Sequence, residues 1–213
     1  MAQERLDWPD LDAIWISHFH LDHCGGIAPF LFGMKHAAET ASRKKRLRIV
    51  GPKGLRRLIE AFDAANNYRL FEQRFPAEVV EVEELEEFEI VQGVRAVAAK
   101  SPHTDESHAI HLRDTAGKTF VYTSDTSFSE VIAAFARKVD LLLMECSFVR
   151  DKPVKIHLEL AEAIYLIRKA EPGRAVLTHF YSVWDEVDFA AEVSRLEPRC
   201  EVLQAVDGLQ LNI

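Results

Sequence analysis

The chain has few cysteines, and the three that it has, Cys24, Cys146 and Cys200, lie far apart without Cys-x-x-Cys spacing. This odd, scattered set argues against a disulfide framework and fits a reducing compartment. The sequence also lacks any run of about eighteen apolar residues and any N-terminal basic segment followed by an apolar core, which argues against a membrane span and a secretory signal. Repeats and low-complexity linkers are missing too. The sequence therefore predicts one cytoplasmic domain over residues 1–213.

The composition is that of a folded enzyme, with 48% hydrophobic and 28% charged residues, enough to bury one substantial core or two packed layers. Apolar runs alternate with helical patterns, which is typical of an α/β fold. Apolar residues recur at helical spacing over residues 55–62 and again over residues 160–167. Both segments are predicted to be amphipathic helices that pack on a sheet.

Strands are predicted between and after these helices. Residues 78–123 contain several short strand patterns with turn signals at Gly93 and Gly117, which favours a meander over strict alternation of strand and helix. At the end of the chain, residues 200–205 and 209–211 flank Asp207-Gly208. That pattern predicts a hairpin that closes the second of two sheets.

The most informative segment is residues 18–23, which read His-Phe-His-Leu-Asp-His and place three imidazoles and one carboxylate within a single turn of backbone. Residues 12–17 before it have the pattern of a buried strand, and Gly25-Gly26 after it lets the backbone bend into a helix. Neutral imidazole and carboxylate suit zinc, with manganese or iron as alternatives. The spacing predicts that one metal is faced by His18 and His20 and a neighbouring metal by Asp22 and His23.

An HxHxDH motif followed by Gly-Gly after a buried strand resembles the metallo-β-lactamase fold hydrolases. The resemblance implies an αββα sandwich, with two mixed sheets face to face and helices outside. It also implies a two-metal site that is completed by a later His, Asp and His, each at the end of a strand. The matching residues are His103, Asp125 and His179, each of which closes an apolar run of strand length. The seven ligands would hold two divalent metal ions bridged by Asp125 and a solvent hydroxide.

Further motifs resemble ribonuclease Z and its relatives: Tyr-Thr-Ser-Asp-Thr at 122–126, Met-Glu-Cys-Ser-Phe at 144–148 and Leu-Thr-His-Phe at 177–180. This resemblance implies that Asp22 acts as a base and that His157 donates a proton or steadies the phosphate. His157 can also be read as an ordinary residue that opens the helix after it. Glu145 either orients His157 through a hydrogen bond or is only the polar end of a strand.

We therefore predict a dinuclear metal hydrolase that cleaves phosphodiester bonds with a metal-bridging hydroxide, acting on a small or cyclic phosphodiester or on an RNA 3′ end. Two divalent cations lower the pKa of bound water from about 15.7 towards roughly 7 and stabilise charge on the phosphate oxygens. One alternative is a carboxylic-ester, thioester or lactone hydrolase of the same fold. Another is a metal-stabilised scaffold that does no chemistry.

The chain departs from the family pattern at its start, because the HxHxDH motif begins at residue 18 and the strands and hairpins that relatives place before it are lacking. An N-terminally truncated sandwich would leave sheet edges exposed. We therefore expect the chain to associate into a homodimer or a larger homo-oligomer.

A second departure concerns the substrate. No glycine-rich, basic arm lies between the first motif and His103, and residues 78–89 contain seven glutamates, which repel phosphate backbones. The net charge of -8 and the absence of an arginine after His179 also argue against tRNA cleavage, and neither DNA nor a membrane is expected as a partner. Against this, the basic cluster that begins at 43–46 either holds a phosphate tail or is a solvated loop and helix face.

Overall fold

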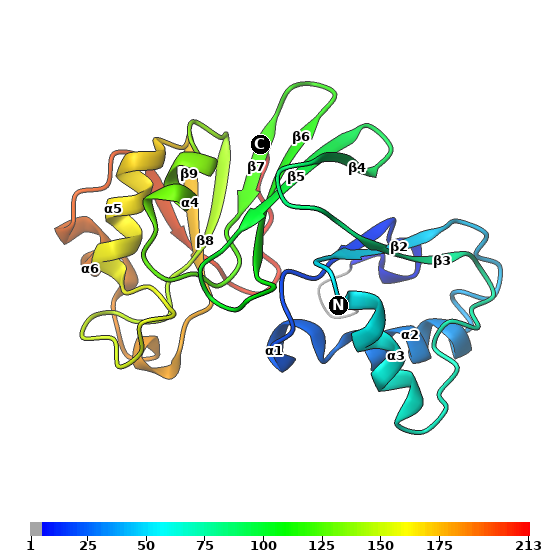
Figure 1. The fold of residues 1–213 in the computed structure, drawn as a ribbon. Helices are drawn as coiled ribbons and strands as arrows, with labels where there is room; N and C mark the ends of the chain where they lie inside the picture. Colours follow the sequence, from blue (N-terminus) through cyan, green and yellow to red (C-terminus); the bar gives the residue numbers. More distant parts are fainter. Residues whose placement is uncertain (1–5) are drawn as a thin grey trace.

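The computed structural model describes residues 6–213, which form two β-sheets covered by helices on their outer faces (Figure 1). The smaller sheet has three parallel strands in the order β1-β2-β3. Its strands are β1 (Ala13–Trp15), β2 (Leu47–Gly51) and β3 (Ala77–Glu81). The connections contain α1 (Leu21–Cys24), α2 (Ile27–His36) and α3 (Leu55–Ala64). Because each crossover contains a helix, successive strands run in the same direction.

The larger sheet has seven strands in the order β10-β9-β8-β7-β6-β5-β4. These are β4 (Glu87–Val91), β5 (Val94–Lys100), β6 (His108–Asp114), β7 (Thr119–Tyr122), β8 (Leu141–Glu145), β9 (Arg174–Thr178) and β10 (Glu201–Gln204). Strands β4 to β7 are antiparallel neighbours, and β7 to β10 are parallel. The predicted meander is thus confirmed from β4 onward, with Gly93 and Gly117 at positive φ in its turns. The expectation that both sheets are mixed holds only for this one.

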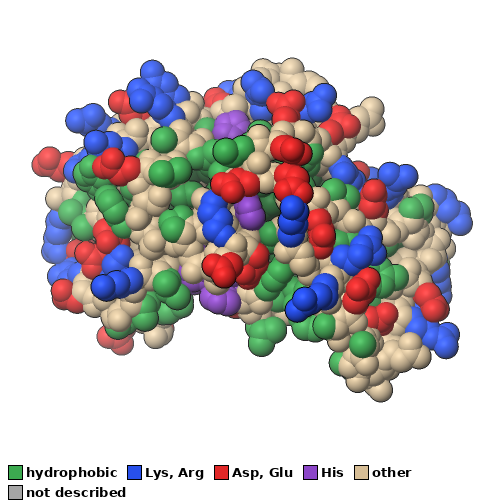
Figure 2. Space-filling view, viewed as in Figure 1, with side chains coloured by type: hydrophobic (Ala, Val, Ile, Leu, Met, Phe, Trp, Pro, Cys, Tyr) green, Lys and Arg blue, Asp and Glu red, His purple; other side chains and the backbone are tan. Residues whose placement is uncertain are grey.

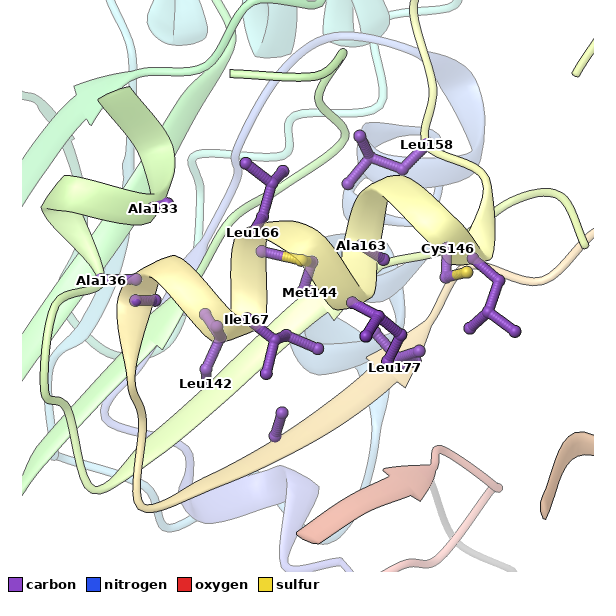
Figure 3. Close-up of a cluster of buried hydrophobic side chains, with 14 of the residues drawn as sticks. Ala133, Ala136, Leu142, Met144, Cys146, Leu158, Ala163, Leu166, Ile167 and Leu177 are labelled. Carbon is purple, nitrogen blue, oxygen red and sulfur yellow. The ribbon is translucent and has the colours of Figure 1, made fainter. Parts of the chain in front are cut away.

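The outer face of the larger sheet is covered by α4 (Glu130–Phe135), α5 (Leu160–Ala170) and α6 (Phe189–Arg195). Leu166 and Ile167 of α5 belong to one buried cluster with Leu142 and Met144 of β8 and Leu177 of β9, and Figure 3 shows Ile167 beside Leu142. All five side chains are essentially inaccessible to solvent. Burying each side chain contributes about 1.5–3 kcal/mol to stability. The apolar residues whose spacing predicted this helix are therefore also the ones that hold it against the sheet.

A second apolar layer lies between the two sheets, and a third lies under α2 and α3. Successive residues of β2 supply both layers, since Ile49 packs toward the helices and Val50 toward the larger sheet. The arrangement is the predicted αββα sandwich, so the fold class is confirmed. Helix α3 begins at Leu55 and α5 at Leu160, as the sequence pattern indicated.

The predicted C-terminal hairpin is wrong. Strand β10 forms, but it pairs in parallel with β9, and residues 209–211 form no strand. A hairpin partner would pair on the outer edge of β10, whose side chains are exposed or half-buried, so little apolar surface is available there. The chain instead crosses the starts of β8 and β9, where Ile213 lines a cavity with Asp140 and Gly173.

Among the described residues, no helix combines the length and the apolar character needed to cross a membrane. The predictions of a single domain and of self-association stay predictions.

Candidate metal centre

The candidate ligands lie where strands of both sheets end. His18 and His20 follow β1, His103 follows β5, Asp125 follows β7 and His179 follows β9 directly. Asp22 and His23 lie on α1, the one-turn helix that begins immediately after His20. Because the C-terminal ends of β5, β7 and β9 meet at one edge of the larger sheet, and β1 ends opposite them, residues far apart in sequence converge.

Two of the turns into the site are left-handed. Ser124, just before Asp125, and His179 itself both have φ of 61°, although neither is glycine. This conformation costs about 1–2 kcal/mol for a residue with a Cβ, and it persists where the surrounding structure holds it, often at functional sites. The strained turns direct the Asp125 carboxylate and the His179 imidazole into one cluster.

Asp125 is the centre of that cluster. Its Oδ2 atom lies 3.2 Å from His23 Nε2, 3.3 Å from His179 Nε2, 3.7 Å from His103 Nε2 and 3.8 Å from His18 Nε2. Zinc at its usual bond lengths holds tetrahedral ligand atoms about 3.4 Å apart. The spacing therefore fits ligands that share metal ions with Asp125 between them.

The remaining candidates divide the cluster into groups. His20 Nδ1 lies 3.0 Å from His103 Nε2, while Asp22 Oδ2 is 3.4 Å from both His23 Nε2 and His179 Nε2. One group contains His18, His20, His103 and Asp125, and another contains Asp22, His23 and His179, while His157 forms a third group with Asp125 and His179. The structure thus brings all seven predicted ligands together, with the pairing that the HxHxDH spacing indicated.

The residues fit divalent metal ions. His18 Nε2 and Asp125 Oδ1 are buried and make no hydrogen bond within the described chain, which is costly for polar atoms unless something else binds them. Burial, helped by the charge of His23, lowers the pKa of His18 to about 4, so its ring is neutral at pH 7. Metal binding needs neutral imidazole and ionised carboxylate.

The Asp125 carboxylate is held in the ionised form. Burial raises its pKa, but the close contact with His23 and the charges of His179 and His23 lower the pKa by more, so it stays below its usual value. The same contacts act on His23 in the opposite direction. Burial lowers the pKa of His23, and the close contact with Asp125 and the nearby carboxylate charges more than offset this, so the pKa is raised.

Polar neighbours orient the ligand rings. His18 Nδ1 lies 3.1 Å from Ser17 Oγ, and His103 Nδ1 donates to the Ile156 carbonyl at 2.9 Å when Nε2 faces the cluster. Ser147 Oγ connects His179 Nδ1, at 2.9 Å, to the carboxylate of Glu145, at 2.8 Å. Such contacts fix the ring orientation that a metal requires. In the sequence, only the position of Ser147 close to Glu145 indicated its role.

Glu145 and His157 form a buried pair beside the cluster. His157 Nδ1 lies 3.0 Å from Glu145 Oε1 and 4.0 Å from Asp125 Oδ2, and its ring stacks on His179 with centroids 5.2 Å apart. Burial lowers the pKa of His157, but the hydrogen bond and charge of Glu145 raise it by more, so the net pKa is above the usual value. Of the two readings of Glu145, the structure favours the orienting one.

The reading of His157 as the opening residue of a helix is wrong. Helix α5 begins at Leu160 with Glu159 as its N-cap, because Glu159 and Glu162 form a reciprocal capping box. His157 lies upstream in an irregular segment and is 5% exposed. Sequence reasoning also missed Tyr181, whose hydroxyl lies 3.2 Å from His157 Nε2.

The basic cluster near residue 43 is largely occupied within the chain. Arg43 is buried and donates to the Leu11 carbonyl at 2.7 Å. Three other members each contact a carboxylate: Lys45 with Asp10 at 2.9 Å, Arg46 with Glu78 at 3.3 Å and Lys53 with Glu83 at 2.8 Å. Figure 2 shows Lys and Arg side chains interspersed with Asp and Glu on the face in view. This favours the reading of the cluster as a solvated face.

Residues 1–180 match the family described as "Beta-lactamase superfamily domain". "Probable metallo-hydrolase YhfI" of Bacillus subtilis (strain 168) is 27% identical over 172 residues, which cover 79% of this chain and 66% of YhfI. The chain thus spans slightly less than two thirds of that relative. Ribonuclease Z of Borrelia hermsii (strain HS1 / DAH) is 20% identical over 267 residues, which cover 99% of this chain and 83% of the relative.

Solved structures resemble the chain over nearly its whole length. The crystal structure of YhfI has a TM-score of 0.74 at 24% identity and covers 96% of this chain and 79% of its own. The structure of human tRNase Z, short form, has a TM-score of 0.71 at 19% identity, with 98% and 81% covered. At these identities the likeness shows the fold alone.

Proposed function

This chain belongs to the β-lactamase superfamily, and from that premise we propose that it is a dinuclear metal-dependent hydrolase of phosphodiester bonds. The observation that carries the proposal is the buried Glu145–His157 pair, which stands at 3.0 Å beside the His and Asp cluster. A thioester releases a thiolate that needs no proton, whereas a phosphodiester releases an alkoxide that must take up a proton. The ribonuclease Z named among the relatives supports the same reaction class.

Two divalent ions, most simply Zn²⁺ with manganese or iron as alternatives, would supply a strong nucleophile at neutral pH and neutralise charge on the phosphate oxygens. His18, His20 and His103 would hold one ion, Asp22, His23 and His179 the other, and Asp125 would lie between them. Ser17, Ser147 and the Ile156 carbonyl keep three of these imidazoles in orientation.

The chain's own residues divide the proton transfers between them. The pKa of Asp22 is lowered, because the charge of His23 and hydrogen bonds outweigh the effect of burial, so its carboxylate is ionised. Its side chain is also well exposed, so we assign it to accept a proton from the attacking water. Glu145 holds His157 in the tautomer with a proton on Nδ1, and the raised pKa of His157 keeps a proton available for the leaving oxygen.

A small or cyclic phosphodiester fits this chain better than an RNA 3′ end. RNA binding depends on cationic side chains that neutralise several phosphates. Here Lys45, Arg46 and Lys53 already contact carboxylates, and two of these carboxylates belong to the acidic segment 78–89. A substrate with a single phosphodiester can bind through the metal centre alone.

The test combines elemental analysis with turnover of bis(p-nitrophenyl) phosphate, a lactone and a thioester by the same preparation, repeated for Asp125→Ala. We expect about two metal ions per chain and turnover of the phosphodiester that is lost in the variant. A 2′,3′-cyclic nucleotide and an RNA with a 3′ extension then separate the two substrate classes.

The other outcomes each contradict the proposal in a distinct way. Turnover of the lactone or the thioester without the phosphodiester would assign the site to ester chemistry. Two metal ions without any turnover would favour a metal-stabilised scaffold, and less than one tightly held ion would remove the dinuclear centre itself.

A further inference from the structure

Only one of the two ring nitrogens of His157 is placed to pass a proton toward solvent. The ring is 5% exposed, and its Nδ1 side faces Glu145. Glu145 accepts hydrogen bonds from Thr126 N, Ser147 Oγ and Leu158 N, and its Oε1 also faces His157 Nδ1 at 3.0 Å, so Nδ1 is the donor in this contact. Nε2 is therefore the nitrogen through which a proton can leave. The atom in front of Nε2 is the Tyr181 hydroxyl oxygen, at 3.2 Å.

Tyr181 is held firmly at this place. Its backbone N–H donates to the Ser147 carbonyl at 3.2 Å, and its ring packs edge-on against Phe148 with centroids 5.0 Å apart. Its ring also lies 5.6 Å from that of His179, on the rim of the metal cluster. Yet the side chain as a whole is 42% exposed. The phenol is thus the solvent-facing end of a hydrogen-bonded chain that runs from Glu145 through His157 to Tyr181.

We propose that the Tyr181 hydroxyl, and not His157 directly, delivers the proton to the leaving oxygen of the substrate. The inference rests on the proposed phosphodiester hydrolysis and names a catalytic residue for it. A leaving group that approaches the cluster from solvent meets the exposed phenol before it meets the buried imidazole. His157 then acts as the proton source behind Tyr181, with Glu145 as the group that orients His157.

The transfer balances within one turnover. Water adds its oxygen to phosphorus, and the bond between phosphorus and the leaving oxygen breaks with its electron pair on that oxygen. The leaving oxygen takes the proton of the Tyr181 hydroxyl as the hydroxyl takes the Nε2 proton of His157. Asp22 takes the proton that water releases and gives it to solvent after the products leave, while His157 regains a proton from solvent through the Tyr181 hydroxyl, so each group ends with the proton count that it had at the start.

Tyr181→Phe separates this role from simple packing, because it removes one hydroxyl and keeps the ring against Phe148. The substrates are methyl p-nitrophenyl phosphate and methyl phenyl phosphate, which differ by one nitro group. p-Nitrophenolate leaves without a proton, whereas phenolate needs one more. General acid catalysis is worth about 10²–10⁴-fold, so we expect kcat on the phenyl diester to fall about 100-fold and kcat on the nitrophenyl diester to change less than about threefold.

Tyr165→Phe is the matched control, because Tyr165 is similarly exposed and also donates its hydroxyl to one partner, Glu130, away from the cluster. This variant should leave both rates unchanged. A second readout does not depend on turnover. In Tyr181→Phe, the ¹⁵N resonance of His157 Nε2 should shift, because its hydrogen-bond partner is lost, while that of Nδ1 should not.

The possible failures can be told apart. If Tyr181→Phe slows both diesters equally, or neither, or leaves the Nε2 resonance in place, the role of Tyr181 is overturned while the phosphodiesterase stands. If the wild-type protein cleaves neither diester, the proposed function fails, and the role of Tyr181 fails with it.

Discussion

Replacing Glu145 by glutamine tests how strongly the buried pair holds the site together. Each carboxylate oxygen of Glu145 faces one backbone N–H, since Oε1 accepts from Thr126 at 2.7 Å and Oε2 accepts from Leu158 at 3.1 Å. Each oxygen also faces one side-chain partner, His157 or Ser147. Glutamine has nearly the same volume, but one of its two ends is an NH₂ group that cannot accept a hydrogen bond.

Whichever way the amide turns, its NH₂ group meets a backbone N–H that can only donate. At least one buried donor is left unpaired, which costs about 1–3 kcal/mol, and the hydrogen bond that it made to Glu145 is lost with it. We expect Glu145→Gln to lower the free energy of unfolding by about 2–3 kcal/mol, because the carboxylate is fully buried and water cannot replace the missing acceptor.

The measurement is urea unfolding of both proteins with the metal removed by a chelator, so that a change in metal affinity does not enter the comparison. Glu201→Gln is the matched control, because Glu201 is exposed and pairs only with Arg174 at the sheet edge. That variant should cost less than about 0.5 kcal/mol. A loss below about 0.5 kcal/mol for Glu145→Gln, with an unchanged m-value, would refute the description of Glu145 as a buried four-bond acceptor.

Three further predictions follow from the cluster and the sheet. Asp125→Ala removes the carboxylate that contacts four histidines, so metal content by elemental analysis should fall from about two ions to below one. Because the pKa of His23 is raised, Zn²⁺ must displace a proton from it, so the affinity of the site for Zn²⁺ should rise with pH up to that pKa and then level off. Calorimetry in two buffers measures the protons released on binding, and no release would contradict this. Gly51→Ala places a Cβ 2.6 Å from the Ile16 carbonyl oxygen and should cost about 1–3 kcal/mol in urea unfolding, whereas Gly33→Ala, with open space around it, should be neutral or stabilising.

Most of the candidate site could be predicted from the sequence because its ligands follow local strand patterns. An apolar run of strand length that ends in His103, Asp125 or His179 indicates both the strand and the polar residue at its end. The two amphipathic helices could be located for a similar reason, since a 3.6-residue apolar period arises within one segment. The resemblance to the superfamily then placed these local features in one fold.

Other features depend on partners that are distant in sequence. β10 runs parallel to β9 because the connection between them contains α6, and its place at the edge of the sheet is not visible in residues 200–211. Likewise, no spacing rule indicates that Tyr181 meets His157 or that Ser147 connects Glu145 to His179. These contacts form only because β8, β9 and the segment before α5 end at one place.

The sequence by itself determined the chemical identity of the site, because three imidazoles and a carboxylate within one turn after a strand have few uses other than binding metal ions. It also determined the layered fold class, since strand and helix periodicities are local properties of the chain. Tertiary structure alone decided that His157 is buried against Glu145 and faces the Tyr181 hydroxyl. Both contacts depend on packing between elements that the sequence keeps apart.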